Sequence, residues 1–203
     1  LADVDVSGGI KLYGVLDQAV TQQTLKNPGS ATGSTVTYTG MFASQATSRL
    51  GVRGTRDLGD GMKGRIQAEI QVEPDNATQL PAANRGTFIG LSKEDAGEVL
   101  LGTQETTAYE IFGMDVNGRV EYKPQVWRTT ATNSIQDRAN NSLKYISPAW
   151  GGLVLHLHKG FSDSGASPNV FTSYGIKFKY DKLNAAFVMD KLENSQASYK
   201  FAG

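Results

Sequence analysis

The most regular feature of the sequence is an alternation of apolar and polar side chains over residues 62–73. Even positions carry only apolar or small residues, and odd positions carry only polar or charged ones. The even set is Met62, Gly64, Ile66, Ala68, Ile70 and Val72, and the odd set is Lys63, Arg65, Gln67, Glu69, Gln71 and Glu73. Because successive side chains of a β-strand point to opposite faces, the pattern predicts a strand with one apolar and one charged face.

The same period of two residues recurs along most of the chain. It covers residues 4–16, 49–53, 138–147, 153–161, 171–182 and 197–203. Residues 85–91 and 97–104 fit less cleanly, because both are apolar at both parities near their shared turn. The 3.6-residue period of an amphipathic helix is hard to find anywhere. We therefore predict an all-β, antiparallel fold and count about ten strands.

The connections between these strands alternate in length. The short ones are residues 57–61, 93–97, 147–152 and 181–184, and each contains Gly, Pro, Asp or Asn, the residues typical of turns. The long ones are residues 21–39, 74–84, 106–137 and 162–170. Successive turns of an antiparallel sheet lie at opposite ends, so the short turns share one end and the long loops the other. This asymmetry is typical of a transmembrane β-barrel of the outer membrane.

The pattern leaves two other interpretations open. One is a soluble β-barrel binding protein or β-sandwich, in which the apolar face would form the core. The other is an outer-membrane barrel with a plugged lumen that serves as a scaffold or adhesin. A requirement for detergent would separate the soluble protein from the other two, and single-channel conductance would separate an open channel from a plugged one.

Composition narrows the choice of partners. The sequence has 20 basic and 20 acidic residues, so its net charge gives no reason to expect a nucleic acid. It contains no Cys and therefore no disulfide or thiolate metal site. No apolar run approaches the ~18 residues of a membrane helix, whereas a membrane strand spreads its hydrophobicity over alternate positions.

Candidate chemistry is sparse. His156 and His158 lie two residues apart on one strand face, and a metal site would need further ligands from other strands. We interpret both histidines as polar lining. Neither a nucleophile elbow nor a phosphate-binding loop is present in a suitable context. We expect no catalytic residues, no bound metal and no cofactor, so the protein is not expected to be an enzyme.

The connection over residues 106–137 is unusual in length and composition. Loops longer than ~12–15 residues are uncommon and are often functional. This one contains Tyr109, Phe112 and Trp127 together with several other apolar residues, so we expect it to pack against something, and the interior of a barrel would accommodate it. Its acidic residues are Glu110, Asp115 and Glu121.

Several segments resemble a known family. The strand–turn–strand run SRLGVRGTRDLGDGMK at residues 48–63 resembles the general porins of Gram-negative bacteria, and most closely the beta-proteobacterial and neisserial branch. Further matches follow in chain order: GIKLYGVLDQAV, RGTFIGLSKEDAGEVLLGTQ, RANNSLKYISPAWGG and ASYKFAG. Together they cover nearly the whole chain.

The resemblance implies a barrel of sixteen antiparallel strands in the bacterial outer membrane, surrounded by lipid bilayer and lipopolysaccharide. It also implies a homotrimer that lets small hydrophilic solutes and inorganic ions diffuse through. With about ten strands and a terminal KFAG, residues 1–203 are expected to be one barrel that is incomplete at its C-terminus, with parts of the chain omitted.

The resemblance further implies a pore constriction. Residues 106–137 would fold inward, and a ladder formed by Arg49, Arg85 and Arg138 would face the loop acids, with Glu69 orienting the arginines. The expected lumen lining comprises Arg53, Lys63, Arg65, Lys144, His156 and His158. Anion preference follows from the ladder. Two positions depart from the family pattern, because Thr103 replaces a frequent Arg and Arg56 replaces a frequent acid.

Overall fold

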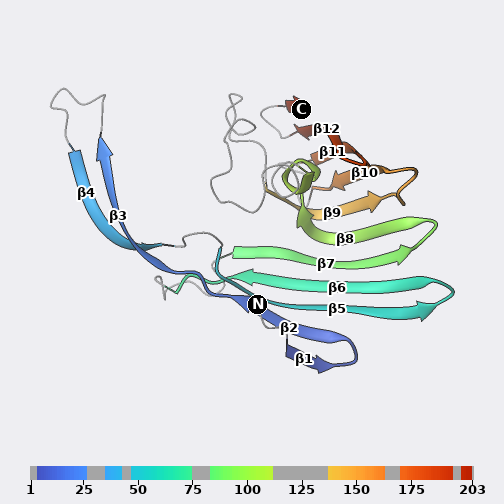
Figure 1. Cartoon of the computed structure of the whole chain (residues 1–203), viewed down its shortest axis with the longest axis horizontal. Coiled ribbons are helices and arrows are strands. Elements are labelled where there is room, and N and C mark those ends of the chain that lie inside the picture. Colours follow the sequence, from blue (N-terminus) through green and yellow to red (C-terminus); the bar gives the residue numbers. More distant parts are fainter. Residues whose placement is uncertain are drawn as a thin grey trace.

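The computed structural model describes residues 4–26, 35–42, 47–74, 83–111, 137–162, 170–193 and 198–202. Its main body is one sheet of eleven strands in which every neighbouring pair is antiparallel (Figure 1). The strands are β1 (Val4–Ser7), β2 (Ile10–Val15), β5 (Arg49–Gly59), β6 (Met62–Gln71), β7 (Ala83–Lys93), β8 (Gly97–Glu105), β9 (Arg138–Ile146), β10 (Leu153–Gly160), β11 (Val170–Tyr180), β12 (Leu183–Glu193) and β13 (Ser198–Ala202). The all-β, antiparallel prediction is confirmed.

The four predicted short turns lie where the alternation places them. They join β5 to β6, β7 to β8, β9 to β10 and β11 to β12, and Figure 1 shows them at a common end of the sheet. The first turns at Asp60 and Gly61, both of which have positive φ angles, 52° and 74°. Asp and Gly tolerate this left-handed conformation better than most residues, which explains their place here.

Two regions differ from the strand assignment made from the sequence. Residues 4–16 form a hairpin rather than one strand, because Gly8 and Gly9 turn the chain with φ angles of 60° and 84°. Val4 then pairs with Leu12, so both still lie on one face. The second region is residues 21–39, expected to be a long connection.

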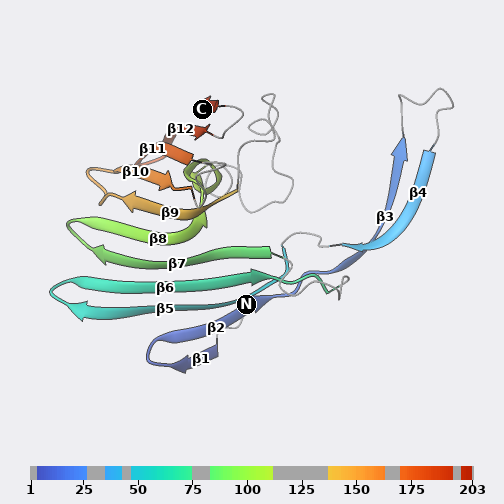
Figure 2. The same ribbon diagram turned by 180° about the vertical axis from the view of Figure 1, so that it is seen from behind.

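Residues 21–39 instead contain most of a second hairpin. β3 (Ala19–Lys26) and β4 (Thr35–Phe42) pair only with each other, and Figures 1 and 2 show the hairpin standing away from the main sheet. β3 has no alternation of apolar and polar residues and gives no strand signal, whereas β4 alternates Thr with Val36 and Tyr38, a short strand signal that was missed.

The main sheet has the reverse of a soluble protein's polarity. One face presents exposed apolar side chains on nearly every strand, including Leu12, Leu50, Ile66, Ile89, Leu101, Leu143, Leu157, Tyr174, Phe187 and Met189. The opposite face buries polar residues, among them Glu69, Lys144 and Asp190. Soluble monomers rarely expose contiguous apolar patches of this kind, so the arrangement favours an apolar face turned to lipid over a soluble barrel with an apolar core.

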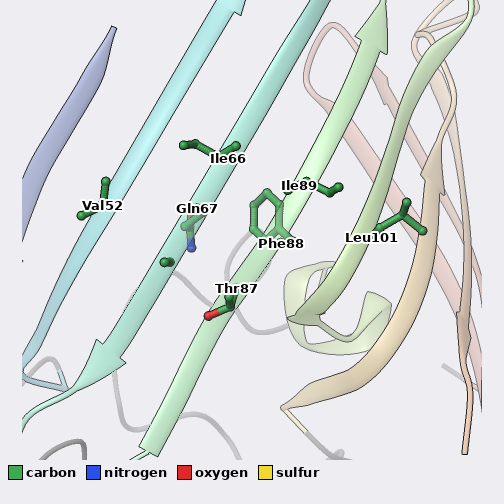
Figure 3. Close-up of a pocket in the computed structure, with 8 residues that line it drawn as sticks. Val52, Ile66, Gln67, Thr87, Phe88, Ile89 and Leu101 are labelled. Carbon is green, nitrogen blue, oxygen red and sulfur yellow. The ribbon is translucent and has the colours of Figure 1, made fainter. Parts of the chain in front are cut away.

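A shallow hollow lies on the described part of the apolar face. It lies over β5–β8, and Figure 3 shows Val52, Ile66, Ile89 and Leu101 around it on four adjacent strands. Ala68 pairs with Val52, and its small side chain leaves the space between its larger neighbours open. Among the described residues, no helix is both long enough and apolar enough to cross a bilayer.

Candidate functional site

The polar face carries a cluster centred on Glu69, which is 8% exposed. Its Oε1 accepts a hydrogen bond from Arg85 Nε, and its Oε2 lies 3.4 Å from Arg49 Nε. Tyr13 donates its hydroxyl to the same Oε2 at 2.8 Å. Two arginines, which stay protonated in proteins, therefore share one carboxylate, and positive charge exceeds negative charge within the cluster.

Alternation explains the positions of Arg49 and Glu69 but not that of Arg85. On β7, Phe88 and Gly90 lie on the polar face, so strict alternation would place Arg85 on the apolar face. The register shifts between Ala68 and Ile70, where β7 has one more residue than β6. This β-bulge lets Arg85 and the residue after it both face Glu69.

Two further arginines stack on aromatic rings of the polar face. The Arg53 guanidinium lies 4.8 Å from the centre of the Tyr13 ring, and that of Arg65 lies 5.1 Å from the centre of Phe88. Arg65 Nε also pairs with Glu98 at 3.1 Å. Lys63 is exposed at the same parity of β6, so these predicted lining residues occupy the polar face together.

Tyr13 and Phe88 were missed as site residues in the sequence. The signal that could have found them is an aromatic residue at the polar parity of its strand: Tyr13 alternates with Ile10 and Leu12 rather than aligning with them, and Phe88 is directly followed by Ile89.

A second cluster of residues surrounds the start of the 106–137 connection, which was predicted to fold inward. Directly after β8, residues 107–111 form a short helical turn, drawn in green in Figure 1. Lys144 on β9 is only 2% exposed, and its Nζ donates to the Glu105 carbonyl at 2.9 Å and pairs with the Glu110 carboxylate. Lys144 thus ties this turn to the polar face.

Apolar contacts seat the same turn on β11 and β12. Ile111 is fully buried and clusters with Ala108 and Val188. A Cβ added to Gly175 of β11 would lie 2.4 Å from Thr107 Cγ2 and 3.1 Å from Ile111 Cδ1. The absence of a side chain at Gly175 therefore allows the turn to approach the sheet this closely.

Arg138 belongs to this second cluster. It pairs with Glu105 at 3.2 Å, and its guanidinium lies 5.8 Å from the centre of the Tyr109 ring. Thr106 N donates to the Asp137 carbonyl at 3.0 Å, which brings the two ends of the connection together at its base. Asp115, Glu121, Phe112 and Trp127, which the sequence placed in the same connection, lie outside the described residues.

The two histidines lie on the polar face but are buried, at 3% for His156 and 2% for His158. His158 Nε2 is 3.0 Å from Ser142 Oγ, and its ring packs edge-on against Phe171 at 5.2 Å. Within the described part of the chain, no three His, Asp or Glu side chains are grouped so that they could hold a metal ion. The histidines and Lys144 thus lie on the polar face with their side chains buried in the wall.

Glu110 retains its negative charge in this setting. Burial raises the pKa of the Glu110 carboxyl group, but the charge and hydrogen bond of Lys144, together with His156 and Lys177, outweigh burial and hold this pKa below its ordinary value of 4.5. A carboxylate with a depressed pKa stabilises the fold above its ordinary pKa, and this contribution is lost as the pH falls through the lower, folded value.

A pH titration follows from this depressed pKa. We expect the difference in thermal stability between the wild type and a Lys144→Met/Glu110→Gln double variant to be constant from about pH 7 to about pH 4.5 and to change only below that. The measurement is the unfolding midpoint of both proteins in detergent at each pH. A difference that already changes between about pH 6 and pH 5 would mean that the pKa of Glu110 is raised instead.

Comparison with known proteins identifies a family and several relatives of this chain. The family described as Gram-negative porin matches residues 1–203. Outer membrane porin protein 32 of Delftia acidovorans is 32% identical over 151 residues, which are 67% of this chain and 41% of that protein. An outer membrane porin protein of Bordetella pertussis is 27% identical over 173 residues, 75% of this chain and 44% of that protein. The chain thus spans less than half the length of these curated relatives.

Solved structures show the same fold. An anion-selective porin from Comamonas acidovorans superposes with a TM-score of 0.69 at 24% identity, covering 91% of this chain and 57% of that one. OmpT, an outer membrane protein of Vibrio cholerae, gives a TM-score of 0.58 at 14% identity over 99% of this chain and 58% of that one. The predicted porin-type β-barrel fold is therefore confirmed for the strands that the chain contains.

Proposed function

Because the chain belongs to the Gram-negative porin family, we propose that the whole protein forms a water-filled channel for passive diffusion of small hydrophilic solutes and ions, with a preference for anions. The family and its named relatives place the chain in the bacterial outer membrane. The observation that carries the anion preference is the sharing of Glu69 by Arg49 and Arg85.

The proposed mechanism is electrostatic and involves no bond-breaking step. Charged side chains on the wall of a narrow pore favour ions of opposite sign, and low-dielectric walls focus their field. Three other ion pairs on the described polar face are one-to-one: Arg65 with Glu98, Arg138 with Glu105 and Lys144 with Glu110. The Glu69 cluster differs from these pairs because two arginines share one carboxylate, which leaves excess positive charge there.

We also propose that residues 106–137 narrow the pore, with Glu110, Asp115 and Glu121 opposite the arginines. Support comes from the first turn of the connection, which lies on the polar face and is tied there by Lys144 and by the contact at Gly175. The proposal extends to a barrel of sixteen strands, of which residues 1–203 contribute the strands described above.

Replacing Gly175 with Ala tests the seat of this connection. The added Cβ would overlap Thr107, and overpacking of this kind costs about 1–3 kcal/mol. We expect the turn to be displaced and the single-channel conductance of the whole protein to rise. Gly64→Ala is the matched control, because its Cβ would meet Leu58 at an ordinary 3.4 Å. Equal conductance for both variants would remove the support for an inward connection.

A homotrimer and contact with lipopolysaccharide remain part of the proposal. The exposed apolar face is the surface that would meet acyl chains or a second copy, and the hollow beside Ala68 could receive side chains from either. Chemical cross-linking of the whole protein in detergent, resolved by mass, tests the trimer, and a purely monomeric product would contradict it.

Conductance of the whole protein in a planar bilayer tests the channel itself. We expect stepwise current increments and, under a salt gradient, a reversal potential of the sign that anion preference gives. A barrel plugged as a scaffold or adhesin would give no current steps, and a reversal potential of the opposite sign would contradict the anion preference.

A further inference from the structure

Tyr13 is uncharged, but it contacts both the Glu69 carboxylate and the Arg53 guanidinium. It is 9% exposed, its hydroxyl donates to Glu69 Oε2 at 2.8 Å, and the Arg53 guanidinium lies 4.8 Å from the centre of its ring. It comes from β2, whereas Glu69 comes from β6, so the side chain must reach across β5 to make this bond.

A glycine on β5 makes that reach possible. Gly51 pairs with Tyr13 on one side and with Glu69 on the other. A Cβ at this position would lie 2.5 Å from Tyr13 Cζ and 2.6 Å from its hydroxyl oxygen. The ring therefore occupies the space that any other residue at position 51 would fill, and the hydroxyl meets the carboxylate beyond it.

The hydrogen bond from the Tyr13 hydroxyl restricts how the Glu69 carboxylate can bind Arg49 and Arg85. A carboxylate can bind one guanidinium with both oxygens, and doing so would release the second arginine. Here Oε1 accepts from Arg85 and Oε2 is shared by Tyr13 and Arg49. With the Tyr13 hydroxyl on Oε2, the carboxylate stays divided between the two arginines.

We propose that Tyr13 is a positioning residue for ion selectivity: it holds Glu69 between Arg49 and Arg85 and shields Oε2 from passing anions. The proposal rests on the proposed anion-preferring channel. Without the hydroxyl, the charge on Oε2 is exposed to the lumen and the carboxylate is free to turn onto one arginine, and both changes weaken the attraction for anions.

The test is a double-mutant cycle in the whole protein, read as the anion-to-cation permeability ratio from reversal potentials. Tyr13→Phe keeps the ring over Gly51 and removes only the hydroxyl. Because a hydrogen bond to a charged group is among the stronger ones, we expect the ratio to fall about two- to threefold. In a Glu69→Gln background the same substitution should change nothing further. Tyr174→Phe, on the exposed apolar face, is the matched control.

The outcomes distinguish the proposed role of Tyr13 from the proposed anion-preferring channel on which it rests. An anion-preferring wild type with an unchanged Tyr13→Phe ratio overturns the role of Tyr13 alone, as does an equal fall in the Glu69→Gln background. A wild type without anion preference overturns both. If Tyr13→Phe does not assemble, Gly51→Ala, whose added Cβ would displace the same ring, must lower the ratio as well.

Discussion

Replacing both Arg49 and Arg85 with Ala in the whole protein is expected to remove most of its anion preference. At about 8 Å in water each unit charge contributes ~0.5 kcal/mol, so losing two changes the anion permeability roughly fivefold. Removing both arginines also leaves the negative charge of Glu69 uncompensated. Of the contacts described above, the carboxylate then keeps only the hydrogen bond from the Tyr13 hydroxyl. The reversal potential under a salt gradient should shift accordingly.

Two controls make this result specific to charge. Arg49→Lys/Arg85→Lys keeps both charges and should retain most of the preference. The effect of the Ala variants should also shrink at high salt, because the Debye length falls from ~10 Å at 0.1 M to ~3 Å at 1 M. A reversal potential that stays at the wild-type value in the double Ala variant would show that these arginines do not set selectivity.

Replacing Lys144 with Met is expected to have the largest effect on stability. Lys144 is 2% exposed and pairs with Glu110, so the substitution leaves a buried carboxylate without its counter-charge. Breaking a buried ion pair in this way costs about 3–5 kcal/mol. The unfolding midpoint should drop, and the channel current should become larger and noisier as the helical turn leaves the wall.

A second substitution should restore the stability that Lys144→Met removes. Glu110→Gln in the Lys144→Met background takes away the buried charge and should recover most of the stability. Lys63→Met, at an exposed position of the same polar parity, should leave the unfolding midpoint near that of the wild type. Wild-type stability and current in Lys144→Met would mean that the ion pair does not hold the connection.

The alternation of residues 62–73 predicted the faces of the sheet because most strands follow a period of two and one face is almost uniformly apolar. Glu69 and Arg49 could be placed on a common face on this basis. Arg85 could not, since a bulge changes its parity, and bulges depend on the register between two strands rather than on the sequence of one. Its assignment came from the family resemblance.

The role of Lys144 was also beyond the sequence. Parity correctly placed it on the polar face, but it gave no sign that a helical turn would cover it. The partners Glu105 and Glu110 come from elements far away in the chain, and only tertiary structure brings them to Lys144. The β3–β4 hairpin was missed because β3 has no apolar face to detect, so the short alternation of β4 had no matching strand before it.

The central claim is that one face of each strand lines an aqueous channel and the other meets lipid. Adjacent single cysteines on β6 test it most directly, since residues 1–203 contain no Cys that would react in the background. In planar bilayers, a water-soluble charged methanethiosulfonate should reduce the single-channel current of Gln67→Cys and leave that of Ala68→Cys unchanged. Equal block at both positions, or block at Ala68→Cys alone, would contradict the claim.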